Sequence, residues 1–239
     1  MGGLAMHKIV VMNGKGGCGK TTISTNIASY YAANGFNTAL FDHDPQGSSM
    51  QWLARRPEAL KSIYGVAAYE QGKTVSRAWQ LRATRAWQLT VPPEIERVVV
   101  DTPAGLKGYE LSEHLKGVDA IVIPVVPCAI DIGATANFLR ELLLAAKVNT
   151  RQTPIYIVPN RVKPRTNSLE GLERFLAGLN IPVLGYLRDT VNYVYGAELG
   201  MGVYELPVSK ADQDRVVWDC MMARIDSQLA SFSRQSNCA

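Results

Sequence analysis

A glycine-rich segment near the start of the chain constrains its fold more than any other feature. Residues 14–21 read GKGGCGKT, follow the apolar run at 7–13 and precede residues 21–34, whose apolar side chains recur at helical spacing until Gly35. The pattern G-x-x-x-x-G-K-[ST] requires this position between a strand and a helix. We therefore predict a strand, a tight loop and a helix in this part of the chain.

Such a loop is suited to holding phosphate groups. Its glycines let backbone N–H groups turn inward around an anion, the following helix adds positive partial charge, and Lys20 neutralises phosphate oxygens. Thr21 supplies a hydroxyl for Mg²⁺. A glycine-rich turn without a ligand is the competing interpretation, which the strand–loop–helix context disfavours. The residues predicted to line the site are Gly14, Lys15, Gly16, Gly17, Cys18, Gly19, Lys20, Thr21 and Thr22.

Further apolar runs alternate with helical patterns along the chain. Predicted strands cover residues 38–42, 98–101, 120–126, 155–159 and 183–187, and predicted helices cover 131–147, with Asp131 as cap, 167–179 and 210–229. This alternation predicts an α/β fold with a doubly wound, mostly parallel sheet and helices on both faces. At 239 residues, the chain fits a single domain, residues 1–239. Residues 67–93, with Trp79 and Trp87, show no clear pattern.

Two of the predicted strands end in aspartates. Asp42 and Asp44 close the run LFDHDPQ one residue apart, so both side chains leave the strand end toward the same side. Asp101 closes the run VVVD, the position from which a carboxylate holds Mg²⁺ through water. Capping of the next helix is the alternative role for Asp42 and Asp44. Ligands bind at the carboxyl ends of strands in such sheets, so we expect these carboxylates near the loop.

The strings KGGCGKTT, DHDPQ and DTPAG together resemble those of the deviant-Walker P-loop ATPases of the ParA/MinD superfamily, over nearly the whole chain. The resemblance implies ATP and Mg²⁺ as cofactors and hydrolysis to ADP and phosphate. It implies that Lys15 reaches across a nucleotide-sandwich homodimer to the partner's phosphates, acting in catalysis with Lys20. Asp44 would position the attacking water, whereas Asp42 would support the Mg²⁺ shell with Thr21 and Asp101.

The same resemblance places the adenine base against a strand exit later in the chain. Asn160, in the string PNR, would hydrogen-bond adenine, whose edge needs both a donor and an acceptor. Arg188 would border the base. These assignments follow from the resemblance and not from spacing.

Charge bears on possible partners. The net charge of +4 is mildly basic, and the resemblance implies nonspecific, salt-sensitive DNA binding by the ATP dimer. It also implies a ParB-like or McdB-like adaptor that stimulates hydrolysis, and a cytoplasmic, nucleoid-associated protein that positions a plasmid, chromosome region or carboxysome. Ordinary solvated surface charge is the competing interpretation. The basic residues concerned are Arg151, Arg161, Lys163, Arg165, Lys210, Arg215 and Arg224.

Two other kinds of superfamily member fit the sequence less well. A MinD-like membrane switch needs a terminal amphipathic helix, but the chain ends in the polar string SQLASFSRQSNCA, so we expect no stable membrane association. A metabolic or redox member that carries an iron–sulfur cluster needs two well-placed cysteines after strands. Cys128 directly follows a predicted strand, but no cysteine directly follows the predicted strand that ends at Asp101. We expect the cysteines to be free thiols.

Overall fold

Strands and helices alternate in the computed structural model, which describes residues 6–71 and 91–236. The strands are β1 (His7–Val11), β2 (Thr38–Asp42), β3 (Ile63–Ala67), β4 (Arg97–Asp101), β5 (Ala120–Val125) and β6 (Ile155–Pro159). The α-helices are α1 (Lys20–Ala33), α2 (Ser48–Leu53), α3 (Ala68–Gln71), α4 (Gly108–His114), α5 (Ala129–Arg140), α6 (Asn167–Ala177), α7 (Val191–Glu198) and α8 (Val208–Ser236). A π-helical turn (Glu141–Ala145) extends α5, and a 3₁₀ turn (Val203–Glu205) precedes α8.

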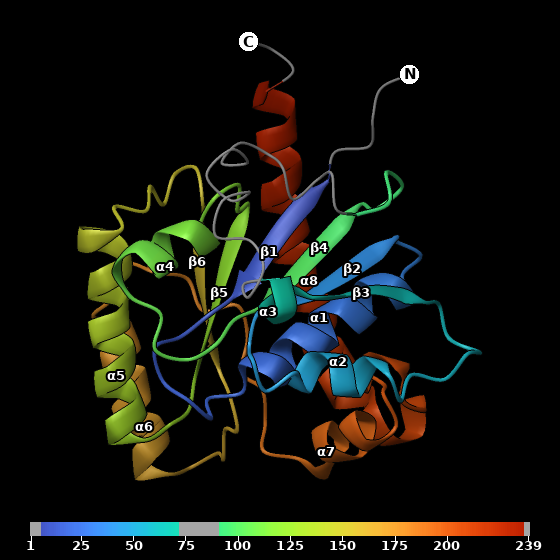
Figure 1. Ribbon diagram of the computed structural model, residues 1–239. Helices are drawn as coiled ribbons and strands as arrows, with labels where there is room; N and C mark the ends of the chain where they lie inside the picture. The colour runs from blue at the N-terminus through green and yellow to red at the C-terminus, as the bar shows by residue number, and fades with distance from the viewer. Residues whose placement is uncertain (1–5, 72–90, 237–239) are drawn as a thin grey trace.

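The six strands form one sheet in the order β3-β2-β4-β1-β5-β6 (Figure 1). All pairings between these strands are parallel. The central strand β1 lies between β4 and β5, so the loop that follows it opens between the carboxyl ends of two neighbours. Ligands bind at this edge in doubly wound sheets. The predicted fold class is confirmed.

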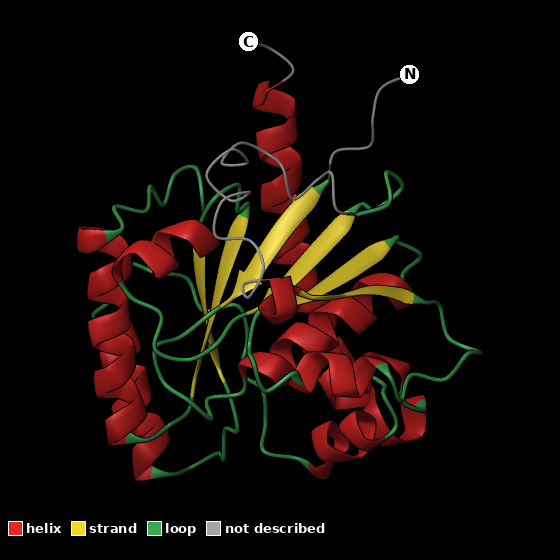
Figure 2. Ribbon diagram, in the orientation of Figure 1, coloured by secondary structure: helices red, strands yellow, loops and turns green. Residues whose placement is uncertain are grey.

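Helices cover both faces of the sheet (Figure 2). On one face, α1 and α8 pack against the strands through residues such as Ile27 and Trp218. On the other, α4, α5 and α6 contribute residues such as Phe138 and Leu172. Because successive strand residues point to opposite faces and both faces are buried, the strands other than the partly exposed edge strand β3 are largely apolar. These continuous apolar runs are why the central strands could be predicted from the sequence.

The prediction of a strand over residues 183–187 is wrong. Main-chain hydrogen bonds run from Leu184 to Ile157 (3.0 Å) and from Leu187 to Pro159 (2.8 Å), but the pairing is limited to isolated bridges at Val183 and Arg188 and forms no continuous strand. Arg224 of α8 donates to the main-chain oxygens of Val183 (2.8 Å) and Leu184 (3.3 Å). Leu184 is buried in the core layer to which α8 belongs.

Other element boundaries also differ from the predictions. Asp131 does not cap α5, since the helix begins two residues earlier and Cys128 occupies the cap position. The edge strand β3 was not predicted because its sequence IYGVA contains a glycine and is partly exposed. Most of the unclear stretch 67–93, including Trp79 and Trp87, lies outside the described residues. In the described part of the chain, no helix combines the length and apolar composition needed to cross a bilayer.

Candidate functional site

The glycine-rich loop lies between β1 and α1 at the carboxyl edge of the sheet. Gly17 and Gly19 have φ angles of 77° and 98°, in the left-handed region that side chains disfavour. Asn13 fixes the start of the loop, because its Nδ2 donates to the main-chain oxygen of Pro124 (2.7 Å) and to Thr135 Oγ1 (3.0 Å). The loop is therefore anchored to β5 and α5 while its glycines make the turn.

The two lysines of the loop have different environments. Lys20 is only 7% exposed, and its Nζ donates across the loop to the main-chain oxygen of Lys15 (3.2 Å). Lys15 is half-buried, and its side chain forms no ion pair with any described residue. Cys18 between them is buried, which raises the pKa of its thiol. Lys20 thus lies over its own loop, and the ammonium group of Lys15 is not held there.

Asp101 ends β4 beside the loop, in register with Val11, the last residue of β1. Its carboxylate is fully buried and accepts hydrogen bonds from Ser49 Oγ (2.7 Å) and Ser24 Oγ (3.3 Å). Burial raises the pKa of Asp101 to about 6, although the bonds from Ser49 and Thr21 favour the charged form. A nearby cation would offset the free-energy cost of burying this negative charge.

Asp42 pairs in register with Asp101, so the two carboxylates lie at the same edge, as predicted. Its oxygens accept three main-chain N–H groups, from Asp44 (3.0 Å), Ser49 (2.9 Å) and Met50 (3.2 Å). Two of these belong to the first turn of α2, so Asp42 has the helix-capping role that the sequence left open. Burial nevertheless raises its pKa. Support of the Mg²⁺ shell by Asp42 stays a prediction.

Asp44 occupies the turn that follows β2 and is half-buried. Its Oδ1 accepts the N–H of Gln46 (3.0 Å), which fixes the carboxylate in the loop before α2. His43, between the two aspartates, packs edge-to-face against His114 of α4 with ring centroids 4.8 Å apart. The positioning of water by Asp44 stays a prediction, and the histidine between the aspartates packs into the protein.

The donor groups at this edge fit a magnesium ion that arrives with a phosphate ligand. Among residues 6–71 and 91–236, no cluster of three or more His, Cys, Asp or Glu could hold a metal by itself. Mg²⁺ usually binds through one or two carboxylates together with water and substrate phosphates. The buried carboxylate of Asp101, with the hydroxyl of Thr21 interacting with it, matches that mode.

Asn160 and Arg188, the predicted adenine contacts, make different interactions. Asn160 follows β6 and is buried; its Nδ2 donates to the main-chain oxygen of Cys18 (2.8 Å), and its Oδ1 accepts the N–H of Arg161 (3.0 Å). Arg188 forms two hydrogen bonds to Asp214 of α8, at 2.7 and 2.9 Å. Asn160 therefore touches the phosphate loop, whereas the guanidinium of Arg188 is engaged with α8. Their roles toward adenine stay predictions.

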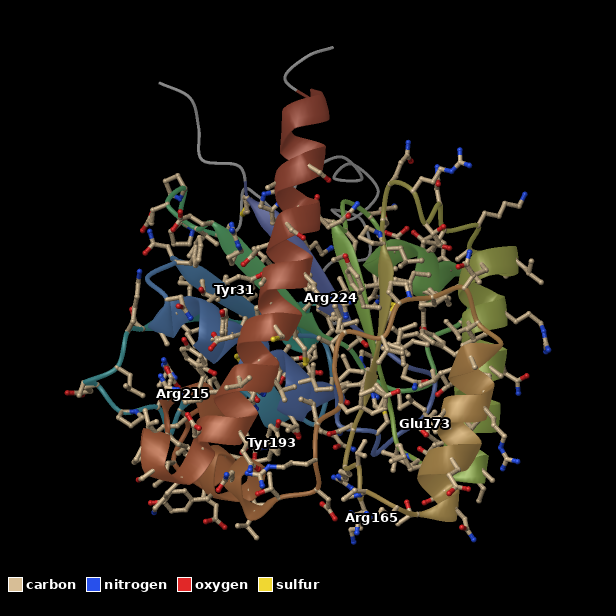
Figure 3. The ribbon with its side chains drawn as sticks, turned by 180° about the vertical axis from the view of Figure 1, so that it is seen from behind. Tyr31, Arg165, Glu173, Tyr193, Arg215 and Arg224 are labelled. Atoms are coloured by element: carbon tan, nitrogen blue, oxygen red, sulfur yellow. The ribbon has the colours of Figure 1, made fainter. Side chains whose placement is uncertain are left out.

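Six of the seven predicted basic residues fall into two groups, one on the segment before α6, which includes Lys163, and one on α8; Arg151 lies apart from both, exposed in the segment before β6. Arg161 and Arg165 are exposed on the segment before α6, and Figure 3 shows Arg165 there, on a different part of this face from Arg224. On α8, Lys210 and Arg215 lie over aromatic rings at 4.7 and 4.5 Å, and Arg224 donates to main-chain oxygens. The segment before α6 is thus better placed to meet phosphates than α8. DNA binding by either group stays a prediction.

Three polar residues that support the site were missed in the sequence. Asn13 anchors the loop, and Ser24 and Ser49 hold the carboxylate of Asp101. Ser24 and Ser49 lie 77 and 52 residues from that aspartate in the chain. No local pattern joins residues so far apart, so only the folded arrangement reveals them.

This arrangement of loop, lysine and strand-end carboxylates agrees with a comparison against protein families. Residues 9–201 match the CobQ/CobB/MinD/ParA nucleotide binding domain. The chain belongs to this family. The resemblance to the ParA/MinD superfamily is confirmed, and the loop after β1 lies within a nucleotide-binding domain.

Individual relatives include proteins of carboxysome distribution. The chain is 28% identical over 199 residues to the "Maintenance of carboxysome distribution protein A" of Halothiobacillus neapolitanus, covering 83% of the chain and 87% of the relative. A protein of the same name from Gloeobacter kilaueensis is 30% identical over 158 residues, 66% of the chain and 64% of that relative. A solved ATP complex of Cyanothece McdA shares the fold, with a TM-score of 0.65 at 14% identity over 95% and 98% of the two chains.

Proposed function

We propose that this chain is a ParA-type ATPase that positions a cargo inside the cell. The observation that carries the proposal is the convergence at one sheet edge of Lys20, which lies across its own loop, with the paired strand-end residues Asp42 and Asp101. The cargo is a plasmid, a chromosome region or a carboxysome. The similarity to carboxysome distribution proteins supports the carboxysome.

In this proposal ATP binds to the loop and its hydrolysis uses residues around it. Lys20 exchanges its contact with the Lys15 main-chain oxygen for phosphate oxygens, which are stronger, charged partners. Asp101, Thr21 and Asp42 hold Mg²⁺, whose positive charge offsets charge on the phosphates. Asp44, held by the N–H of Gln46, orients the attacking water. These assignments follow the sequence prediction for each residue.

We further propose that ATP joins two copies of the chain. The side chain of Lys15 forms no ion pair with a described residue of its own subunit, which suits a role in trans on the partner's phosphates. The ATP dimer then binds nonspecific DNA, and a ParB-like or McdB-like adaptor stimulates hydrolysis. Hydrolysis dissolves the dimer, so the protein cycles between the nucleoid and the cytoplasm.

Nucleotide binding, hydrolysis and dimerisation are separated by three variants. Lys20→Ala is expected to weaken ATP binding in calorimetry, whereas Asp44→Ala binds ATP, hydrolyses it poorly and accumulates as a dimer in light scattering. Lys15→Ala binds ATP as a monomer. Exposed Lys107, outside the predicted site, provides a matched control as Lys107→Ala. Full ATPase activity of both Lys20→Ala and Asp44→Ala would contradict the mechanism.

DNA binding is tested by gel shift with no nucleotide, with ADP, and with ATP plus Mg²⁺, at low and moderate salt. We expect a shift only with ATP, and we expect added salt to abolish it, because phosphate contacts release counterions. Absence of a shift in every state would argue for a membrane-bound or metabolic member of the family. Vesicle sedimentation with ATP then distinguishes these two.

A further inference from the structure

We propose that Asn160 is a positioning residue that holds the phosphate loop in its binding conformation. This inference rests on the proposed ATP-binding function of that loop. The resemblance gives Asn160 a contact with the base, but its Nδ2 donates to the main-chain oxygen of Cys18 within the loop, at 2.8 Å. The residue is 4% exposed, so water cannot readily replace this donor.

The hydrogen bond fixes one particular peptide group of the loop. In a trans peptide the C=O and N–H point in opposite directions, so holding the Cys18 oxygen toward Asn160 turns the N–H of Gly19 to the other side. Inward-pointing N–H groups are what a phosphate loop offers to its ligand. Asn160 therefore fixes the orientation of the N–H of Gly19, the last loop residue before α1 begins.

The close approach of Asn160 also explains why residue 19 is glycine. A Cβ atom at Gly19 would lie 2.1 Å from Asn160 Nδ2, a separation that real atoms do not reach. The φ angle of 98° at Gly19 independently disfavours a side chain. Both the backbone conformation and the space left by Asn160 thus require glycine there.

Asn160 is itself held firmly. Its main-chain N–H donates to the oxygen of Val125 at the end of β5 (2.8 Å), and its Oδ1 accepts the N–H of Arg161 (3.0 Å). Asn13 holds the start of the same loop by donating to Pro124, also on β5. Two asparagines therefore fasten the loop at separate points to the β5–β6 side of the sheet.

The amide of Asn160 keeps unused hydrogen-bonding capacity. One N–H goes to Cys18 and one lone pair of Oδ1 to Arg161, which leaves one donor and one acceptor. Adenine offers N7 as acceptor and its N6 amino group as donor, the pair that an asparagine amide matches. A single side chain can thus read the base and hold the loop, so loss of Asn160 weakens phosphate binding even when no base is present.

Inorganic tripolyphosphate with Mg²⁺ separates these two roles, because it has phosphates and no base. We expect Asn160→Ala to bind tripolyphosphate about tenfold more weakly than the wild type in calorimetry, the effect of losing a buried hydrogen bond. The loss for ATP is larger by the contribution of the base. Asn180→Ala, an exposed asparagine replaced in the same way, binds both as the wild type does. Unchanged tripolyphosphate affinity with weakened ATP binding would overturn the proposal.

A second measurement needs no ligand and uses the buried thiol of Cys18. In a background with Cys128, Cys220 and Cys238 replaced by serine, a thiol reagent labels Cys18 only when the loop opens. We expect Asn160→Ala to increase the labelling rate roughly tenfold, because the hydrogen bond no longer opposes opening. An unchanged rate would contradict the proposal.

The labelling rate also keeps the two hypotheses apart. A wild type that binds neither ATP nor tripolyphosphate refutes the proposed function, while the labelling rate still tests whether Asn160 holds the loop. If Asn160→Ala does not fold, Asn160→Ser carries the same expectations, because its hydroxyl lies one bond closer to the main chain and does not replace the amide donor. Circular dichroism of each variant checks that it is folded.

Discussion

Replacing Asp101 by asparagine is expected to stabilise the ligand-free protein while abolishing the Mg²⁺-dependent ATPase activity that we propose for it. The Asp101 carboxyl is fully buried, and burial raises its pKa from 3.8 to about 6. At pH 7 the native state must therefore hold a buried carboxylate that the unfolded chain keeps in water. Asparagine has the same shape without the charge, and the hydroxyls of Ser24 and Ser49 can both donate to it and accept from it.

The magnitude follows from the two pKa values. Their separation of roughly two units, at 1.36 kcal/mol per unit, makes the charged carboxylate cost ~3 kcal/mol at pH 7. Between pH 3.8 and about 6 the native state binds more protons than the unfolded state, so this penalty shrinks as the pH falls. The advantage of Asp101→Asn over the wild type is therefore ~3 kcal/mol at pH 7 and about half as large at pH 5.

Urea unfolding without nucleotide, in a metal chelator, measures this difference. The fluorescence of the buried Trp52 and Trp218 reports the transition. Comparing variant and wild type at each pH cancels the titration of other groups. Asp212→Asn, an exposed aspartate on α8, is the control and changes stability by less than about 0.5 kcal/mol. A variant less stable than the wild type at pH 7, or an advantage independent of pH, would refute the reasoning.

Three further predictions use the same unfolding assay. Burial and the neighbouring His114 lower the pKa of His43 from 6.5 to about 3, so on acidification the unfolded chain is protonated at this residue before the native state. Between pH 7 and 5 the free energy of unfolding of the wild type should therefore fall by ~2 kcal/mol relative to that of His43→Gln. Equal pH dependence of the two free energies of unfolding would contradict this. Arg56→Ala leaves Glu205 buried and unpaired and costs about 3–5 kcal/mol, whereas replacing both residues by apolar ones costs clearly less. Gly202→Ala places a Cβ 1.7 Å from a buried hydroxyl and costs about 1–3 kcal/mol; wild-type stability would show that the backbone adapts.

The central part of the fold and its loop could be predicted because their signals are local. Strands β1, β2, β4, β5 and β6 are buried on both faces and are therefore continuous apolar runs. The loop needs glycine at Gly17 and Gly19, where φ is positive, and a lysine, Lys20, as the first residue of α1. Each of these features is written in consecutive residues, so a single sequence carries them.

The rest depends on contacts between distant residues. Leu184 and Leu187 are buried in the core layer to which α8 belongs, and a sequence does not reveal which element covers an apolar run. The helix-capping contacts of Asp42 and the hydrogen bond from Asn160 to the Cys18 main-chain oxygen likewise depend on where α2 and the loop lie in the folded protein. Aspartate and asparagine can serve several partners, and only the three-dimensional arrangement determines which they meet.

Stability and nucleotide binding are coupled at this edge of the sheet. The buried carboxyls of Asp42 and Asp101 both have raised pKa values, so their charges destabilise the ligand-free protein. In the proposed function, a nucleotide that arrives with Mg²⁺ supplies the missing positive charge and occupies the loop that Asn13 and Asn160 hold in place. Binding then offsets the cost of the buried carboxylate charges in addition to forming new contacts. The wild type should accordingly gain more stability from Mg²⁺ and ATP than its phosphate contacts alone provide, and Asp101→Asn, in which that penalty is already absent, should gain much less.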